Sequence, residues 1–222
     1  MSEDKVIVEL NNVYLRSSRG YEVFRDLNFK LLAGHSAIIH GTAGSGKSSF
    51  IEMLIGRQFS ESGSVEVFGN LITSCKKGFI KKNRRKIGGV GGIFSLVPSY
   101  TVADNISLPL ILSGARRKSR NDRLSEILTE FSLLKQAKEF PANLTRVENM
   151  LVQFARASIA HQPLLIIDEP LAGFDQKTYQ RLYDYMFKLA VSGLSLIIVS
   201  SEELENKLPN CQSYRINDGA LE

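Results

Sequence analysis

The sequence predicts an α/β fold in which a central sheet, buried on both faces, is flanked by helices. Short continuous apolar runs such as "SAIIH" (36–40) and "LLIID" (164–168) have the length of buried strands. They alternate with segments of helical periodicity, as expected for a mostly parallel sheet. A Gly-rich stretch, 41–49, joins the first run to a helical segment and predicts a strand–loop–helix unit.

The remaining elements follow from runs rich in Val, Ile and Phe. The expected strands are Val6–Leu10, Val23–Leu32, Ser36–His40, Ser64–Phe68, Leu164–Asp168, Ser195–Ser200 and Ser213–Ile216. Helices are expected at Gly46–Gly56 and after Asp175, where Tyr179, Leu182, Met186 and Leu189 share one face. The "NDG" at 217–219 predicts the tight turn of a terminal hairpin.

The segment from about Asp104 to Ala160 has helical patterns and lacks convincing strands. We interpret it as a helical subdomain inserted into the α/β core. Residues 1–222 are therefore expected to form a single domain that carries this insert.

Composition narrows the class of protein. With 222 residues, 43% of them hydrophobic, the chain is long enough to bury a core, and no apolar run approaches the roughly 18 residues that span a bilayer. The first residues are acidic where a secretory signal is basic, so we expect a cytoplasmic protein. Cys75 and Cys211 lie far apart, without metal-ligand spacing, and are expected to be reduced thiols.

The stretch "GTAGSGKSS" matches GxxxxGK[ST] in full and follows a strand, as its mechanics require. Its backbone N–H groups are expected to surround phosphates, with Lys47 reaching the β- and γ-phosphates and Ser48 coordinating Mg²⁺. The predicted binding residues are Gly41, Thr42, Ala43, Gly44, Ser45, Gly46, Lys47, Ser48 and Ser49.

A second half of this site is expected at the end of the strand "LLIID". Asp168 is positioned to hold Mg²⁺ through water, and Glu169 is the candidate general base that orients the attacking water. The predicted metal ligands are thus Ser48 and Asp168, and the predicted catalytic residue is Glu169.

Over almost its whole length the chain resembles the nucleotide-binding subunits of ATP-binding cassette (ABC) systems. The residues that carry this resemblance are "DLNFKLLAG", "GSVEVFG", "YTVADNISLPLILSGA", "ARA", "DEPLAGFD" and "INDGALE". The nearest groups serve lipoprotein release, cell division and phospholipid trafficking. The resemblance implies a P-loop NTPase core with an N-terminal antiparallel β-subdomain and an inserted helical subdomain, and the cofactors ATP and Mg²⁺. It also implies two partners: an integral membrane permease-like subunit at the inner face of the membrane, and a second cassette, identical or not.

The sequence departs from this family at the signature motif, which is LSGGQ or LSGGE in the family. The matching residues here, Leu144–Glu148, are "LTRVE". Both glycines, which let backbone N–H groups approach the partner's γ-phosphate, are replaced by Arg146 and Val147. We expect these side chains to obstruct that approach, and a direct contact from Arg146 to phosphate is the alternative.

Two further positions depart from the family, and one is ambiguous. Gly92 stands where the Q-loop glutamine is expected, and Ser201 where the switch histidine is expected. Either Tyr14 or Tyr21 is the candidate for stacking on adenine. We therefore expect intact MgATP binding with slow or partner-dependent hydrolysis; the alternative is a regulatory subunit that holds ATP without cleaving it.

The formal net charge of +5 favours anionic partners. Basic residues concentrate in "KKGFIKKNRRK" (76–86) and "RRKSRNDR" (116–123). They could attract anionic lipid headgroups or acidic loops of a membrane partner, or form solvated helical faces. Nucleic acid is a less favoured partner because no basic platform with interleaved aromatic residues is present.

Overall fold

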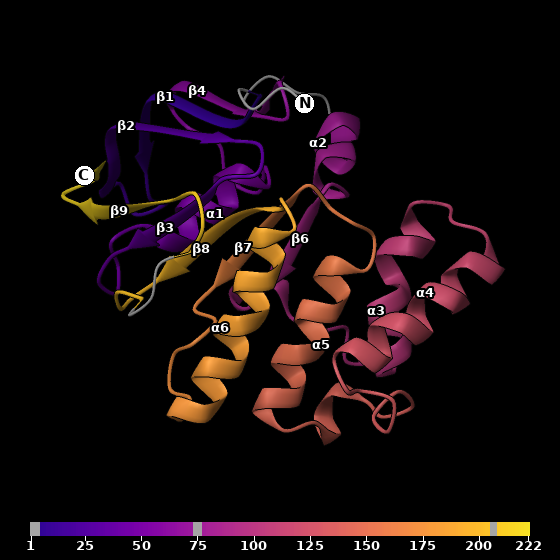
Figure 1. Cartoon of the computed structure of the whole chain (residues 1–222). Coiled ribbons are helices and arrows are strands. Elements are labelled where there is room, and N and C mark those ends of the chain that lie inside the picture. Colours follow the sequence, from indigo (N-terminus) through magenta and orange to yellow (C-terminus); the bar gives the residue numbers. More distant parts are fainter. Residues whose placement is uncertain (1–4, 73–76, 205–207) are drawn as a thin grey trace.

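The computed structural model describes residues 5–72, 77–204 and 208–222, which form two stacked sheets and a layer of helices (Figure 1). The central sheet has the order β10-β9-β3-β8-β7-β6, and its neighbours are parallel except for β10 against β9. These strands are β3 (Ser36–His40), β6 (Ile87–Val90), β7 (Leu164–Asp168), β8 (Ser195–Ser200), β9 (Cys211–Asn217) and β10 (Ala220–Leu221). The predicted α/β class with a buried parallel sheet is confirmed.

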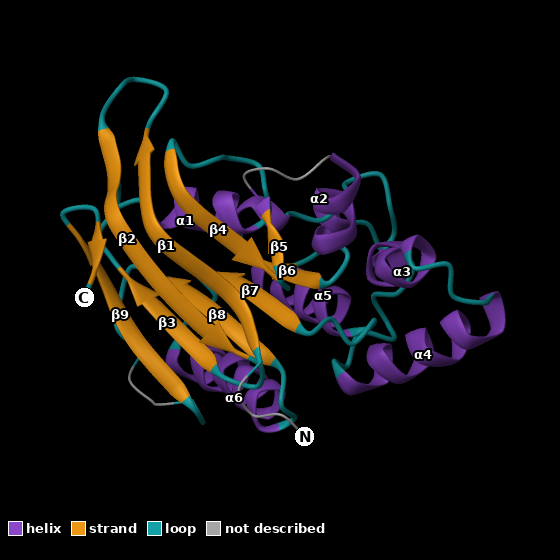
Figure 2. Ribbon diagram, turned by 90° about the horizontal axis from the view of Figure 1, so that it is seen from above, coloured by secondary structure: helices purple, strands orange, loops and turns teal. Residues whose placement is uncertain are grey.

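The second sheet is antiparallel and has the order β2-β1-β4-β5. Its strands are β1 (Val6–Arg16), β2 (Glu22–Leu32), β4 (Ser62–Val67) and β5 (Asn70–Leu71). Figure 2 shows this sheet lying over the central one. Apolar side chains of both sheets and of α1 (Lys47–Leu54) share one core, in which Phe29 meets Phe50 edge to face at 5.3 Å.

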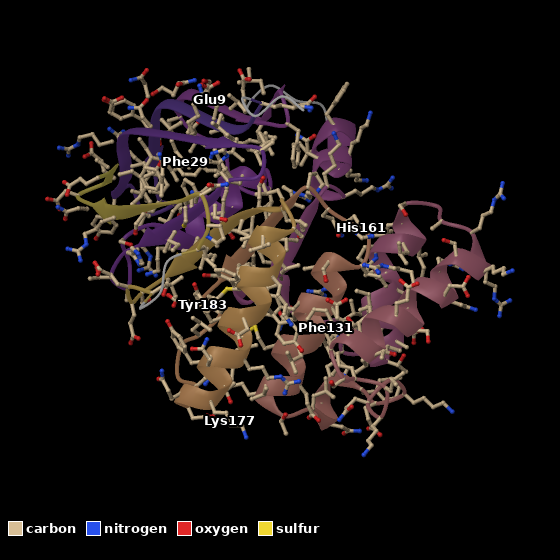
Figure 3. The ribbon with its side chains drawn as sticks, in the orientation of Figure 1. Glu9, Phe29, Phe131, His161, Lys177 and Tyr183 are labelled. Carbon is tan, nitrogen blue, oxygen red and sulfur yellow. The ribbon has the colours of Figure 1, made fainter. Side chains whose placement is uncertain are left out.

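Helices α5 (Arg146–Ser158) and α6 (Gln176–Val191) cover the other face of the central sheet, and α3 (Val102–Leu112) and α4 (Arg117–Glu130) lie beyond α5, away from the sheet (Figure 1). Helix α2 (Lys77–Arg84) precedes β6. Short 3₁₀ turns, η2 (Gly92–Phe94) and η3 (Pro141–Asn143), lie in the connections. The second core includes Phe131 stacked on Tyr185 at 4.7 Å, and Figure 3 shows Phe131 among these helices.

Each of the seven predicted strands is present, and the predicted helix after Asp175 begins at Gln176, with Leu182 and Met186 buried. The terminal hairpin is also confirmed, because Asn217 pairs with Ala220 across a turn in which Asp218 and Gly219 have positive φ. β1 extends well beyond the prediction, to Arg16, through irregular register shifts.

Strand β6 was not predicted. Its sequence, "IGGV", contains two glycines, which weaken a strand pattern. The structure gives the reason for Gly88: a Cβ there would come within 2.4 Å of the Ala157 carbonyl oxygen on α5. The close approach of α5 therefore requires glycine.

The segment 104–160 contains α4 and α5 and most of α3, and the structure describes no strand in it. Its status as an inserted subdomain stays a prediction. Cys75 lies outside the described residues, while Cys211 has a free thiol, half-buried, and burial raises its pKa to about 11. In the described part of the chain, no helix combines the length and apolarity that crossing a membrane requires.

Candidate functional site

The predicted phosphate loop connects the end of β3 to the start of α1, as the sequence indicates. Gly46 precedes α1 with φ 107°, and a Cβ at this position would lie 2.9 Å from the Phe24 ring. Both the backbone conformation and the space require glycine here. The loop is therefore fixed against β2, with Thr42, Ala43, Gly44 and Ser48 exposed and Ser45 and Ser49 half-buried.

Lys47 begins α1 and is almost fully buried. Its ammonium donates hydrogen bonds to the carbonyl oxygens of Gly41 (2.6 Å) and Thr42 (3.0 Å), and lies 3.8 Å from Oε1 of Glu169. The loop thus brings a buried cation beside the carboxylates at the end of β7.

A pocket of about 920 Å³ lies next to the loop. It is lined by loop residues 42–45, by the start of β2 and by the terminal hairpin at 216–219. Tyr21 lines this pocket with 70% of its surface exposed, whereas Tyr14 lies outside the lining and pairs with Ser62 in the antiparallel sheet. The geometry favours Tyr21 as the ring that faces a ligand.

Asp168 is the last residue of β7 and Glu169 follows it, and both lie beside Lys47. Burial raises the pKa of Asp168, the charge of Glu169 raises it further, and Lys47 opposes both effects. Glu169 has φ 49°, an unusual conformation for a non-glycine residue, and its N–H donates to the Val199 carbonyl oxygen at 2.8 Å. This bend aims the carboxylate at the end of β8.

Ser201 makes a contact that the sequence did not reveal. Its backbone N–H donates to Oε2 of Glu169 at 3.0 Å, and its hydroxyl donates to Oε1 of the same carboxylate. The residue at the expected switch-histidine position therefore holds the candidate general base at both oxygens.

Gly92 also lies in the site, directly against Asp168. It has φ 43°, and a Cβ at this position would come within 1.8 Å of Oδ2 of Asp168. Neighbouring Gly91 donates its N–H to Oε1 of Gln153 on α5 at 2.7 Å, a link that sequence reasoning missed. In this arrangement the Asp168 side chain occupies the space that a side chain at position 92 would need.

The residues present fit a nucleotide with Mg²⁺. The Ser45 hydroxyl is buried without a hydrogen-bond partner among the described residues, although it lies in the predicted phosphate loop. Within the described ranges no three His, Cys, Asp or Glu side chains group as a metal site. Ser48 and Asp168 instead form the small oxygen set that suits Mg²⁺ when phosphates supply further ligands.

The degenerate signature lies at the N-terminus of α5, on a different element from the phosphate loop. Thr145 caps α5 through a reciprocal capping box with Glu148. Arg146 donates hydrogen bonds to the loop between β7 and α6. The structure does not bring this end of α5 to the chain's own Lys47 site.

A family model described as "ABC transporter" matches residues 24–172, about two thirds of the chain, and spans the phosphate loop and the β7 carboxylates. The chain belongs to the ABC transporter family. The chain superimposes on the solved dimeric structure of MJ0796, a bacterial ABC transporter cassette, with a TM-score of 0.86 at 25% identity, and the match covers 97% of each chain.

Curated relatives of this ABC cassette serve several systems. The chain is 30% identical to the methionine import ATP-binding protein MetN of Latilactobacillus sakei over 87% of the chain's own length, but it spans only 57% of MetN. It is 28% identical to the lipoprotein-releasing ATP-binding protein LolD of Alcanivorax borkumensis, covering 96% of this chain and 94% of LolD. The cell division protein FtsE of Streptococcus pneumoniae is 27% identical over 87% of this chain and 84% of its own. Two of the expected groups are thus represented, and methionine import was not expected.

Proposed function

We propose that this cassette binds MgATP and powers or regulates a membrane-associated transport or envelope-maintenance complex. The observation that carries the proposal is the phosphate loop itself: its residues 42–45 border a 920 Å³ pocket, and its Lys47 ammonium is buried 3.8 Å from Oε1 of Glu169 and close to Asp168. ATP would supply the γ-phosphoryl group and Mg²⁺ its charge neutralisation. Lys47 would contact the β- and γ-phosphates, Ser48 and Asp168 would hold Mg²⁺, and Tyr21 would stack on adenine.

Hydrolysis in this proposal depends on Glu169, which would orient the attacking water and accept its proton. Ser201 bonds to Glu169 and offers no histidine side chain to the γ-phosphate, and Gly92 provides no side chain near the Mg²⁺ position. Turnover is therefore expected to be slow or dependent on partners, since poor positioning costs about a hundredfold in rate.

A second candidate function is a regulatory subunit that holds ATP without cleaving it. The contact of Ser201 with both oxygens of Glu169 favours this candidate, because a carboxylate satisfied by the protein has less capacity to bind water. The two candidates share the same binding site and differ only in turnover.

The proposed partners are a second cassette and an integral membrane subunit, which would hold this protein at the inner face of the membrane. The support for a membrane partner is a groove of about 430 Å³ between α2 and α3. Its floor is apolar, with Phe94, Leu108, Pro109 and Leu112, and Lys81 and Arg85 line it as cations. Anionic lipid headgroups near the same cations are a further proposed contact.

The site is tested by calorimetry of MgATP binding. Lys47→Ala is expected to weaken binding roughly tenfold to a hundredfold, because charge-assisted contacts are worth about 1.5–3 kcal/mol. Tyr21→Ala is expected to weaken it about tenfold through lost stacking. The matched controls are Lys30→Ala, an exposed lysine in β2, and Tyr14→Ala, which lies outside the pocket.

Unchanged affinity in Lys47→Ala, with folding intact by circular dichroism, would refute the site. Equal losses in Tyr14→Ala and Tyr21→Ala would refute the assignment of adenine to Tyr21. Turnover measured on the same samples separates the two candidate functions: ATPase activity that disappears in Glu169→Gln supports the enzyme, and activity no different from Glu169→Gln supports the ATP-holding subunit.

A further inference from the structure

Positive charge is concentrated in the part of the chain that contains α2, α3 and the start of α4. Residues 78–121 include nine Lys and Arg but a single acidic residue, Asp104, whereas the whole chain has 28 basic and 23 acidic residues. The rest of the chain is therefore net acidic. Asp104 is already engaged at the start of α3, where it accepts the N–H and the hydroxyl of Thr101 in a capping box. Charge segregated in this way indicates an anionic partner for this part of the molecule.

The outward face of α2 consists of cations and one aromatic ring. Ile80 and Asn83 are buried and fix the helix to the molecule, Asn83 by donating a hydrogen bond to a β4 carbonyl oxygen at 3.0 Å. Phe79 points away from that contact and is 51% exposed. The exposed cations of this cluster are Lys81, Lys82 and, directly after the helix, Arg85.

A second cluster lies where α3 ends and α4 begins. Ile111, near the end of α3, is 48% exposed, and residues 113–115 lead from α3 toward α4. The next side chains along the chain are exposed cations, namely Arg116, Arg117 and Lys118. This cluster therefore has the same composition as the first, an exposed apolar side chain with several cations.

The two clusters border the same groove. Lys81 and Arg85 line the groove from α2, and Leu108 and Leu112 line it from α3. Figure 1 and Figure 2 both place α2 and the turn between α3 and α4 on one side of the molecule, away from the C-terminal hairpin. We call the six cations of the two clusters the basic surface: Lys81, Lys82, Arg85, Arg116, Arg117 and Lys118.

The fold does not use the cations of the basic surface. None of the six makes an ion pair or a side-chain hydrogen bond with another described residue. Two neighbouring cations differ: Arg84 donates to the Ile55 and Gly56 carbonyl oxygens, and Lys86 lies over the Phe68 ring at 5.2 Å. The basic surface is thus the part of this charge that is left for a partner.

Exposed apolar side chains beside unpaired cations favour an anionic lipid surface over other anionic partners. At the boundary between headgroups and acyl chains, apolar side chains enter the membrane while Lys and Arg contact the headgroups. An aliphatic side chain such as Ile111 gives a nucleic-acid base no aromatic ring on which to stack. Two clusters on separate helices, on either side of a groove, also suit an extended surface better than a single short peptide.

We propose that the basic surface binds an anionic bilayer directly, with Phe79 and Ile111 entering the headgroup region, so that lipid as well as protein holds the cassette at the membrane. This inference rests on the proposed membrane association and names lipid as a direct partner in it. It does not require that the phosphate loop bind MgATP. The groove between the two clusters stays open for a segment of a protein partner.

Binding is measured by cosedimentation of the full chain with vesicles of equal parts phosphatidylglycerol and phosphatidylcholine, and with vesicles of phosphatidylcholine alone. We expect roughly tenfold tighter binding to the anionic vesicles, and a smaller difference at high salt, because exposed charges are then screened. Lys81→Gln with Lys82→Gln, and separately Arg116→Gln with Arg117→Gln, should each weaken this binding about tenfold or more. Each cation near an anionic surface contributes about fivefold.

The matched control for charge is Lys177→Gln with Arg181→Gln, which changes the net charge by the same amount. Both side chains are exposed on α6, and Figure 3 labels Lys177 at the end of α6 that lies away from α2. We expect this variant to bind the anionic vesicles within about twofold of the wild type, because its two sites lie beyond the reach of screened charges at the membrane.

The apolar contact is tested by Phe79→Ser against Phe187→Ser, which changes a second exposed Phe, on α6. Phe79→Ser is expected to weaken binding severalfold, also at high salt, because the insertion of an aromatic ring does not depend on charge. Phe187→Ser should bind as the wild type does. Circular dichroism shows whether each variant is folded.

Equal losses in the α2, α4 and α6 charge variants would show attraction by net charge alone and would overturn the inference. Equal binding to both kinds of vesicle would overturn it too. Tighter binding to duplex DNA at the same phosphate concentration would assign the surface to nucleic acid instead.

Absence of vesicle binding by the folded chain would also overturn the inference, and would leave the basic surface to an acidic protein segment. Calorimetry of MgATP binding on the same sample separates this failure from a failure of the nucleotide site. Vesicle binding without MgATP binding would overturn the proposed nucleotide site and still support the lipid contact.

Discussion

Ser201 shows how a single residue can change the chemistry expected of this site. In the family that the chain resembles, a histidine at this position contacts the γ-phosphate beside the general base. Here a short hydroxyl and a backbone N–H both bind Glu169. The group that would contact phosphate is replaced by one that positions the base.

Ser201→Ala is therefore expected to lower kcat about tenfold with little change in KM. A hydrogen bond to a charged group contributes about 1.5 kcal/mol at the low end of the usual range, and that loss falls on the orientation of Glu169. Steady-state ATPase kinetics measure the effect. Ser201→Thr keeps the hydroxyl and should retain most activity, while a faster Ser201→Ala enzyme would show that Ser201 restrains Glu169.

At the residue scale the sequence predicted the groups that a local motif specifies. Residues 41–49 join an apolar strand to a helix, and Asp168 and Glu169 end a second apolar strand, so each group could be recognised from its own stretch of sequence. The contact of Ser201 with Glu169 joins residues 32 apart, and that of Gln153 with Gly91 joins residues 62 apart. Such pairs depend on the packing of β7, β8 and α5, which no local pattern specifies.

At the scale of elements, α5 is defined by its first turn. Thr145 and Glu148 form a capping box, and hydrogen bonds from the Thr145 backbone and hydroxyl, with a smaller contribution from Gln136, lower the pKa of Glu148. Because the folded-state pKa of Glu148 lies below its unfolded-state pKa, the ionised carboxylate stabilises the fold, and this contribution is complete above the unfolded-state pKa. It is lost as the pH falls through the folded value.

Thr145→Ala is expected to destabilise the protein by about 1 kcal/mol at pH 7, which lowers Tm by roughly 2–4 °C for a chain of this size. The difference in Tm from the wild type should shrink as the pH falls below the unfolded-state value of about 4.3 and through the lower folded-state pKa of Glu148, because the carboxylate becomes protonated over that range. Thermal denaturation followed by circular dichroism, at pH 7 and at a pH low enough to protonate Glu148, measures the difference in Tm. Thr145→Ser retains the cap, and a pH-independent loss would contradict the role of the carboxylate.

The sequence predicted an element correctly where apolar runs and turn residues marked it, and missed an element where close packing required glycine in place of apolar side chains. The terminal hairpin follows from Asp218 and Gly219, whose positive φ values suit the turn. Strand β6 packs against α5 so closely that position 88 must be glycine. A glycine has no apolar side chain, and the sequence therefore lacks the pattern by which a strand is recognised. A glycine pair therefore concealed the strand that leads to Gly92.

For the whole molecule, the groove between α2 and α3 is the surface most suited to a membrane partner. The groove-lining residues that the structure describes include no Asp or Glu, whereas Lys81, Arg84 and Arg85 are among them. Arg84 is bonded to the Ile55 and Gly56 carbonyl oxygens, and Arg156, which also lines the groove, to those of Phe94 and Ser95. Lys81 and Arg85 therefore remain as the cations for a partner. An apolar floor with free cations at its edge favours an acidic, partly apolar segment.

A photo-crosslinking residue at Leu112, which lines the groove and is 50% exposed, is expected to form an adduct with an integral membrane protein in the native cells. The matched control is the same residue at Phe187 on α6, which is 41% exposed and lies outside the groove. Lys81→Glu with Arg85→Glu should reduce the Leu112 adduct severalfold, because like charges would then face an acidic segment. Equal adducts from both positions, or an adduct unaffected by charge reversal, would show that the partner docks elsewhere or through apolar contact alone.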